Sequence, residues 1–156
     1  MAYLRQRGHI SALKTDHAGV TRDVLRFFGV ADLHAWEATW KSPQAAYKKA
    51  ASTTTDNYAL ATWLRLGELQ VANQPLPAYS VDRLFEVLPA LRALTLTPAD
   101  SYGDAVRSMV ELSASAGVAV VFEPEIPGTK CYGATRWLNG ETPLVQLSLR
   151  GKKDDA

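Results

Sequence analysis

Apolar residues in the first hundred positions recur at intervals of three and four, which places them on one side of a helix. In TRDVLRFFGV, residues 21–30, Thr21 is a possible N-cap and Gly29 a stop signal for a short helix. The segment DLHAWEATW, residues 32–40, carries its apolar side chains at helical offsets as well. The pattern therefore predicts a helical region over residues 1–72.

Two further segments of this region are predicted to be helical. SPQAAYKKAAS, residues 42–52, begins with Ser42 as a possible cap and has Pro43 at the first helical position. TDNYALATWLRLGELQVAN, residues 55–73, is the most periodic segment of the chain, with Asp56 as its cap. Together with the two segments before them, they predict short helices joined by short connections.

Residues 73–80, NQPLPAYS, have the composition of a linker or turn. A helix is predicted to follow, with Ser80 as its cap, and Pro89 lies inside it, where we expect a kink or an interruption. Residues 99–117 predict one more helix, which ends at Gly117. The predicted total is five or six helices.

After Gly117 the hydrophobic period changes from helical to that of strands. VAVVF, residues 118–122, is a short β-branched run typical of a buried strand. Residues 130–138 and 142–149 flank an Asn-Gly pair, which favours a type I′ hairpin turn. The sequence therefore predicts an α+β fold, in which helices precede a small antiparallel sheet of three strands within residues 81–156.

The predicted last strand has two different faces. Leu144, Gln146 and Ser148 alternate with an apolar set formed by Val145, Leu147 and Leu149. A hairpin with so many apolar side chains needs a packing partner, and an uncovered strand edge promotes association. We therefore expect a protein partner or a second copy of the chain to contact the C-terminal hairpin.

Composition and charge narrow the class of protein only slightly. The net charge is +1, from 17 Lys and Arg against 16 Asp and Glu, which indicates neither a nucleic-acid nor a membrane partner. The single cysteine, Cys131, allows no disulfide within the chain. No apolar run approaches the ~20 residues that cross a bilayer, and the first residues do not resemble a secretory signal. We expect a cytoplasmic protein.

No self-sufficient catalytic set is evident. The three histidines, His9, His17 and His34, are not paired at helical spacing, and H-E-x-x-H is absent, so no zinc site is predicted. Cys131 has no histidine near it in sequence and is interpreted as a small apolar strand residue. Glu123 and Glu125 could face one way as an acid–base pair, but the prolines beside them favour a solvated loop.

Nucleic-acid binding is not predicted from these residues either. Basic side chains are scattered among acidic ones, and the four tryptophans are interpreted as core anchors and not as base-stacking platforms. We therefore expect no DNA contact from this chain alone.

Three segments together resemble the ImmA/IrrE family, whose long members join a helix-turn-helix of the Xre type to a zinc metallopeptidase-like domain. The segments are LRFFGV followed by DLHAWEATW, then ATWLRLGEL, and finally residues 116–155, AGVAVVFEPEIPGTKCYGATRWLNGETPLVQLSLRGKKDD. The resemblance covers roughly residues 20–154, and its C-terminal third is the most specific part. It implies a bacterial-type transcriptional regulator or antitoxin of a toxin–antitoxin system.

In that family the helix-turn-helix precedes the matching region, and a helix with H-E-x-x-H follows it. The resemblance therefore implies a truncated, catalytically incomplete member that is not an enzyme and holds no cofactor, since zinc belongs to full-length relatives. The alternative is half of a split metallopeptidase whose H-E-x-x-H helix comes from another chain. By similarity the hairpin strands are scaffold or a peptide-facing edge, with possible contacts through Arg136, Trp137, Leu144 and Gln146.

Overall fold

The computed structural model describes residues 1–41, 46–49, 55–96 and 101–148. These residues form six helices and one four-stranded sheet, so the α+β prediction is confirmed. In chain order the elements are α1 (Ala2–Gln6), α2 (His17–Phe28), α3 (Leu33–Trp40), β1 (Ala46–Lys49), α4 (Asn57–Val71), α5 (Val81–Leu94), α6 (Tyr102–Ser115), β2 (Ala119–Phe122), β3 (Cys131–Leu138) and β4 (Thr142–Leu147).

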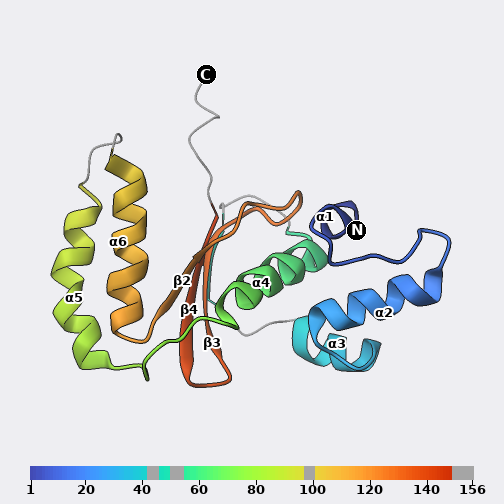
Figure 1. Ribbon diagram of the computed structural model, residues 1–156, viewed down its shortest axis with the longest axis horizontal. Helices are drawn as coiled ribbons and strands as arrows, with labels where there is room; N and C mark the ends of the chain where they lie inside the picture. The colour runs from blue at the N-terminus through green and yellow to red at the C-terminus, as the bar shows by residue number, and fades with distance from the viewer. Residues whose placement is uncertain (42–45, 50–54, 97–100, 149–156) are drawn as a thin grey trace.

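The elements are arranged in layers around the sheet (Figure 1). Helix α4 packs on one face of the sheet against β2, β3 and β4, and α2 contacts the outer side of α4. The α5–α6 pair covers the other face, chiefly through α6 and β2. The sheet is therefore the centre of the molecule, with helices on both sides of it.

Side-chain caps set where most of the helices begin. The carboxylates of Asp16, Asp32 and Asp56 accept hydrogen bonds from main-chain N–H groups in the first turns of α2, α3 and α4. Ser80 caps α5 in the same way, through the N–H of Arg83. Capping by short polar side chains satisfies N–H groups that have no partner inside the helix. The predicted caps of α4 and α5 are thus confirmed.

Helix α2 begins earlier than the sequence pattern indicated. Thr21, predicted as its possible cap, lies inside the helix, where its hydroxyl donates to the carbonyl of His17. Asp16 accepts a 2.9 Å hydrogen bond from Gly19 N instead, which adds a turn before Thr21. The end of the helix is as predicted, because Gly29 takes the left-handed conformation that glycine adopts without strain.

The predicted helix over residues 42–52 is wrong where the structure describes it. Its expected cap and proline, Ser42 and Pro43, lie outside the described residues, but Ala46–Lys49 form strand β1. This strand pairs antiparallel with β3, with Ala46 opposite Thr135. Four residues cannot sustain a helix by propensity alone, and pairing with an available strand edge overrides their local preference.

The sheet is mixed, which corrects the prediction of an antiparallel one. Its strand order is β1-β3-β4-β2, and β2 runs parallel to β4, with Ala119 opposite Leu144. Strands β3 and β4 form the predicted hairpin, and Asn139 and Gly140 have the positive φ angles, 51° and 73°, of a type I′ turn. The hairpin therefore forms the middle of the sheet, with β1 beside β3 and β2 beside β4.

Apolar side chains of the hairpin pack against helices of this chain on both faces of the sheet. Leu144 packs with Val71 of α4 in one buried cluster. Val145 and Leu147 pack on the opposite face, against the α5–α6 layer that includes Met109. Both hairpin strands also have neighbours on each side, so the sheet edges belong to β1 and β2.

Helix α5 continues through Pro89 from Val81 to Leu94, so the predicted interruption does not occur. Its apolar stripe is only partly covered: Leu84 packs in the cluster around β2, whereas Phe85 is largely exposed. The connection over residues 73–80 carries no helix or strand and joins α4 to α5.

Candidate partner-binding groove

A groove of about 660 Å³ opens between the C-terminal ends of α2 and α3, the second half of α4 and the β3–β4 turn. Polar side chains line much of it, including Thr39, Gln74, Asn139 and Thr142. Its lining residues come from α3, α4 and the β3–β4 hairpin, together with the segment that joins α2 to α3 and the one that follows α4. It is large enough to admit several side chains of another protein.

Two arginines share one glutamate in the wall of this groove. Arg65 Nη1 lies 2.6 Å from Glu68 Oε1 within α4, and Arg136 Nη2 of β3 lies 2.8 Å from Glu68 Oε2. Only 16% of the Arg65 side chain and 11% of the Arg136 side chain are exposed. The three side chains form a charged network, shielded from most of the solvent, that links α4 to β3.

Main-chain carbonyls hold both guanidinium groups in place. Arg65 Nε donates a 2.6 Å hydrogen bond to the carbonyl of Phe27, and Arg136 Nη2 donates a 2.9 Å bond to that of Leu64. The Arg136 guanidinium also lies over the Trp40 ring, 5.3 Å from its centroid. Gly29 leaves room for this arrangement, since a Cβ at that position would lie 3.0 Å from Arg65 Nη2.

The four predicted contact residues are found in different environments. Arg136 lies in the groove wall, and Trp137 lies at its rim with 55% of its surface exposed. Leu144 and Gln146 are fully buried beneath α4. Alternation along β3 separates the first two, because Trp137 faces the α5–α6 side, where its ring meets Tyr79 edge-on.

The Gln146 side chain is enclosed between β4 and α4 and is not open to a ligand. Its Nε2 donates a 2.6 Å hydrogen bond to the carbonyl of Trp63 in α4. Gly67 of the same helix makes room for the Gln146 side chain, because a Cβ there would fall 2.1 Å from the amide oxygen. This hydrogen bond therefore links α4 to the face of β4 that carries Leu144 and Gln146.

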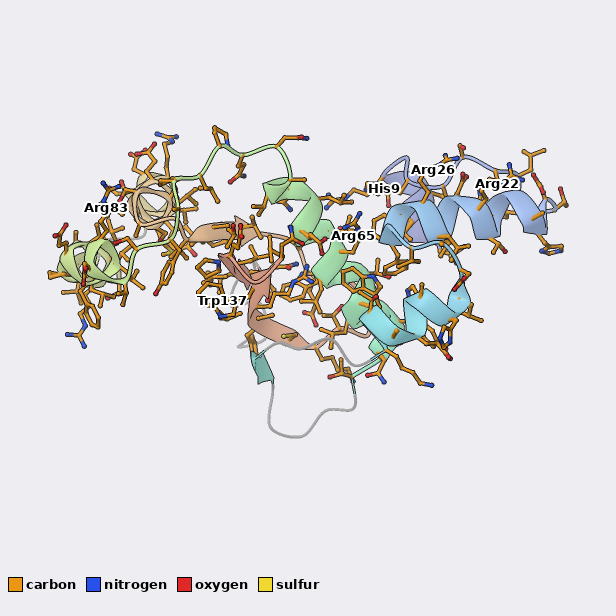
Figure 2. All side chains as sticks on the ribbon, turned by 90° about the horizontal axis from the view of Figure 1, so that it is seen from below. His9, Arg22, Arg26, Arg65, Arg83 and Trp137 are labelled. Atoms are coloured by element: carbon orange, nitrogen blue, oxygen red, sulfur yellow. The ribbon has the colours of Figure 1, made fainter. Side chains whose placement is uncertain are left out.

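Sequence reasoning missed Arg65 and Glu68, which complete the network around Arg136. Figure 2 shows Arg65 on α4, with Trp137 on the neighbouring hairpin. The available signal was an opposite-charge pair three residues apart inside an otherwise apolar helix. Their convergence with Arg136 depends on how α4 packs on β3, which the sequence pattern does not specify.

A second polar cluster surrounds Glu123, directly after β2. Its carboxylate accepts hydrogen bonds from Tyr3, Arg7 and Gln70 at 3.1, 2.7 and 2.6 Å, and only 1% of its side chain is exposed. Burial, together with the bond to Glu123, raises the pKa of the Tyr3 phenol. The predicted solvated loop is therefore wrong for Glu123, which is enclosed by residues from α1 and α4.

The two carboxylates of this loop do not act together. Glu125 accepts a 2.9 Å hydrogen bond from Lys130 N and so stabilises the turn that leads into β3. The donors described above, on Tyr3, Arg7, Gln70 and Lys130, belong to this chain, and the arrangement is that of a structural tie between distant segments.

The remaining candidates are separated from one another. Cys131 is buried, and its Sγ lies 3.1 Å from the carbonyl oxygen of Gly133. His9 stacks obliquely on Phe27, with ring centroids 4.9 Å apart, whereas His17 and His34 are exposed. In the described part of the chain, no three His, Cys, Asp or Glu side chains are grouped so that they could hold a metal ion.

Comparison with known proteins found no matching family model, no matching curated protein and no matching solved structure. Within residues 1–41, 46–49, 55–96 and 101–148, none of the helices combines the length and apolar character needed to span a membrane.

Proposed function

We propose that this chain is a module of an ImmA/IrrE-type regulator or antitoxin that works in the cytoplasm by binding another protein, and that it supplies recognition and not catalysis. The resemblance to that family, strongest over residues 116–155, motivates the proposal. A helix followed by three paired strands, α6 to β4, is compatible with the leading part of a peptidase-like sheet.

The observation that carries the binding role is the groove beside α4. Its arginines are positioned in advance by main-chain carbonyls and by the Trp40 ring, so little conformational entropy is lost when a partner binds. Trp137 at the rim is the kind of exposed aromatic residue that contributes strongly to protein interfaces. The groove therefore offers preorganised polar groups, with an exposed tryptophan beside it on the opposite face of the hairpin.

Binding to the purified products of the adjoining genes tests this function. We expect one of them to bind with a micromolar or lower Kd in calorimetry, and Trp137→Ser to weaken binding about tenfold because rim aromatics act as anchors. Tyr102→Ser is the matched control, because Tyr102 is also exposed but lies on α6. Equal binding by both variants, or no binding by any product, would refute the proposal.

Light scattering on the isolated chain gives an independent measurement of self-association. The proposal expects a monomer, because the hairpin faces are covered by α4 and by the α5–α6 pair. A dimer that Trp137→Ser dissociates would instead show that the partner is a second copy of the chain. A bound product that carries H-E-x-x-H, with zinc retained only by the complex, would favour the split-peptidase alternative.

A further inference from the structure

We propose that the groove binds an acidic side chain of a partner protein, whose carboxylate pairs with Arg65 and Arg136. The inference rests on the proposed partner-binding function and names the chemistry of the bound segment. Its basis is a charge imbalance in the groove wall. Arg65 and Arg136 bring two positive charges, and among the described residues that line the groove only Glu68 is acidic.

The single carboxylate of Glu68 is already fully engaged. One of its oxygens pairs with Arg65 and the other with Arg136, so each arginine holds only half of a carboxylate. One positive charge in the groove therefore remains without a counter-ion. Because both guanidinium groups are mostly shielded from water, that excess charge is poorly hydrated, and a second carboxylate would stabilise it.

Unused donors are available on both arginines. Arg65 Nη2 and Arg136 Nη1 have no hydrogen-bond acceptor in the part of the chain that the structure describes. Arg136 Nε also lacks one, but it is buried and out of reach of a ligand. Guanidinium groups bind carboxylates through short, charge-assisted hydrogen bonds that are stronger than those between neutral groups. Two fixed arginines with spare N–H groups therefore form a receptor for one more carboxylate.

The magnitude of the charge favours a carboxylate over a phosphate. The uncompensated charge is a single positive one, which one carboxylate neutralises, whereas a phosphate dianion would leave an excess negative charge beside Glu68. Around the arginines, Thr39, Gln74 and Asn139 can hydrogen-bond the main chain of an extended segment. The groove therefore suits an Asp or Glu within a peptide and not a nucleic-acid backbone.

Nuclear magnetic resonance on the ¹⁵N-labelled chain tests the inference with two peptides, acetyl-AAEAA-amide and acetyl-AAQAA-amide. We expect the glutamate peptide to shift the arginine Nε–H signals of Arg65 and Arg136 and the indole signal of Trp40. Its affinity should exceed that of the glutamine peptide by about tenfold, the contribution of one charge-assisted contact. Equal affinities, or shifts confined to other surfaces, would overturn it.

Further probes distinguish the source of the carboxylate. Acetyl-AAQAA with a free C-terminus should bind more weakly than the glutamate peptide, because the proposed ligand is a side chain within a segment. Inorganic phosphate should produce smaller shifts at Arg65 and Arg136 than the glutamate peptide does at equal concentration. Stronger binding of either probe at these arginines would overturn the assignment.

Two substitutions should act in opposite directions. Arg65→Gln removes one of the two charges and should weaken the glutamate peptide about tenfold, whereas Glu68→Gln removes the competing carboxylate and should tighten it. Arg107→Gln is the matched control, because Arg107 lies exposed on α6 and pairs with Asp104 of the same helix. If Arg65→Gln does not fold, Glu68→Gln still tests the inference. Unchanged or weaker binding of the glutamate peptide to Glu68→Gln would contradict it.

The outcomes for the two proposals are separable. If a neighbouring gene product binds in a Trp137-dependent way while the two peptides bind equally, only the carboxylate inference fails. If the glutamate peptide binds selectively but no gene product does, the groove remains a carboxylate receptor and the proposed function fails.

Discussion

The carboxylate of Glu123 and the guanidinium of Arg7 lie 2.7 Å apart, although 116 positions separate them in the chain. Tyr3 bonds to the same carboxylate oxygen as Arg7, so two residues of the N-terminal segment meet the end of β2. Gln70 of α4 takes the other oxygen. The cluster thereby connects three segments that are distant in sequence around one buried charge.

Replacing Glu123 should cost more stability than replacing its partner. Glu123→Ala removes a buried carboxylate that accepts hydrogen bonds from Tyr3, Arg7 and Gln70, and we expect a loss of about 3 kcal/mol in the free energy of unfolding because all three bonds are lost together. Arg7→Ala should cost only about 1 kcal/mol, because 40% of the Arg7 side chain is exposed and water screens its charge. Urea denaturation measures both values. Equal losses would show that the ion pair itself, and not the buried acceptor, holds the segments together.

The stabilisation that Asp23 gives to the folded protein should be lost in acid. Hydrogen bonds from the main-chain N–H groups of Ala12 and Ser11 lower the pKa of this carboxyl below its usual 3.8. Its stabilisation is therefore complete above that usual value and is lost as the pH falls through the lower value in the folded protein.

Thermal denaturation of the wild type and Asp23→Asn across the acidic range checks this. The difference in stability between them should shrink once the pH falls below about 4. Asp104→Asn is the control, since the Asp104 side chain is 80% exposed. A difference for Asp23→Asn that does not change with pH would contradict the assignment.

Two glycines in helices should respond oppositely to alanine. In Gly67→Ala the new Cβ meets the buried Gln146 amide at 2.1 Å, and we expect a net loss of about 1–2 kcal/mol from overpacking, after the gain in helix propensity. In Gly103→Ala nothing lies within 4 Å of the new Cβ, so the variant should gain about 0.5 kcal/mol. Chemical denaturation of both variants provides the comparison. A stabilised Gly67→Ala protein would mean that Gln146 has another position available to it.

Alanine substitutions at Gly117 and Gly140 should distinguish the cost of backbone strain from the cost of a steric clash. Both have positive φ angles, 77° and 73°. A Cβ at Gly117 would also lie 2.6 Å from Tyr79 Cα, whereas the space beside Gly140 is open. Gly140→Ala should therefore cost about 1 kcal/mol, the cost of left-handed backbone, and Gly117→Ala at least about 3 kcal/mol. Melting temperatures that fall by the same amount would rule out the added steric term.

The sequence was most informative where structure depends on neighbouring residues. Asp56 and Ser80 begin their helices as predicted, because a cap needs only the N–H groups two or three positions further along. The Asn139-Gly140 turn is equally local, since the two residues themselves adopt the φ angles that the hairpin requires.

It was least informative where distant segments decide the outcome. Residues 46–49 have no strand signal of their own and are extended because β3 offers them an edge. The burial of Glu123 depends on Tyr3 and Arg7, and the convergence of Glu68 with Arg136 depends on how α4 lies on the sheet. Hydrophobic periodicity contains no information about such pairings.

The position of β1 in the sheet determines how the protein can be cut into two fragments. Strand β1 comes from the first half of the chain but pairs with β3 from the second half, and α4 covers strands from the second half. A cut in the connection over residues 73–80 would therefore separate a helical piece from a sheet that lacks one strand and its cover. The two pieces should be poorly soluble alone and should reassociate when mixed, so this connection is a natural site for fragment complementation and a poor one for truncation.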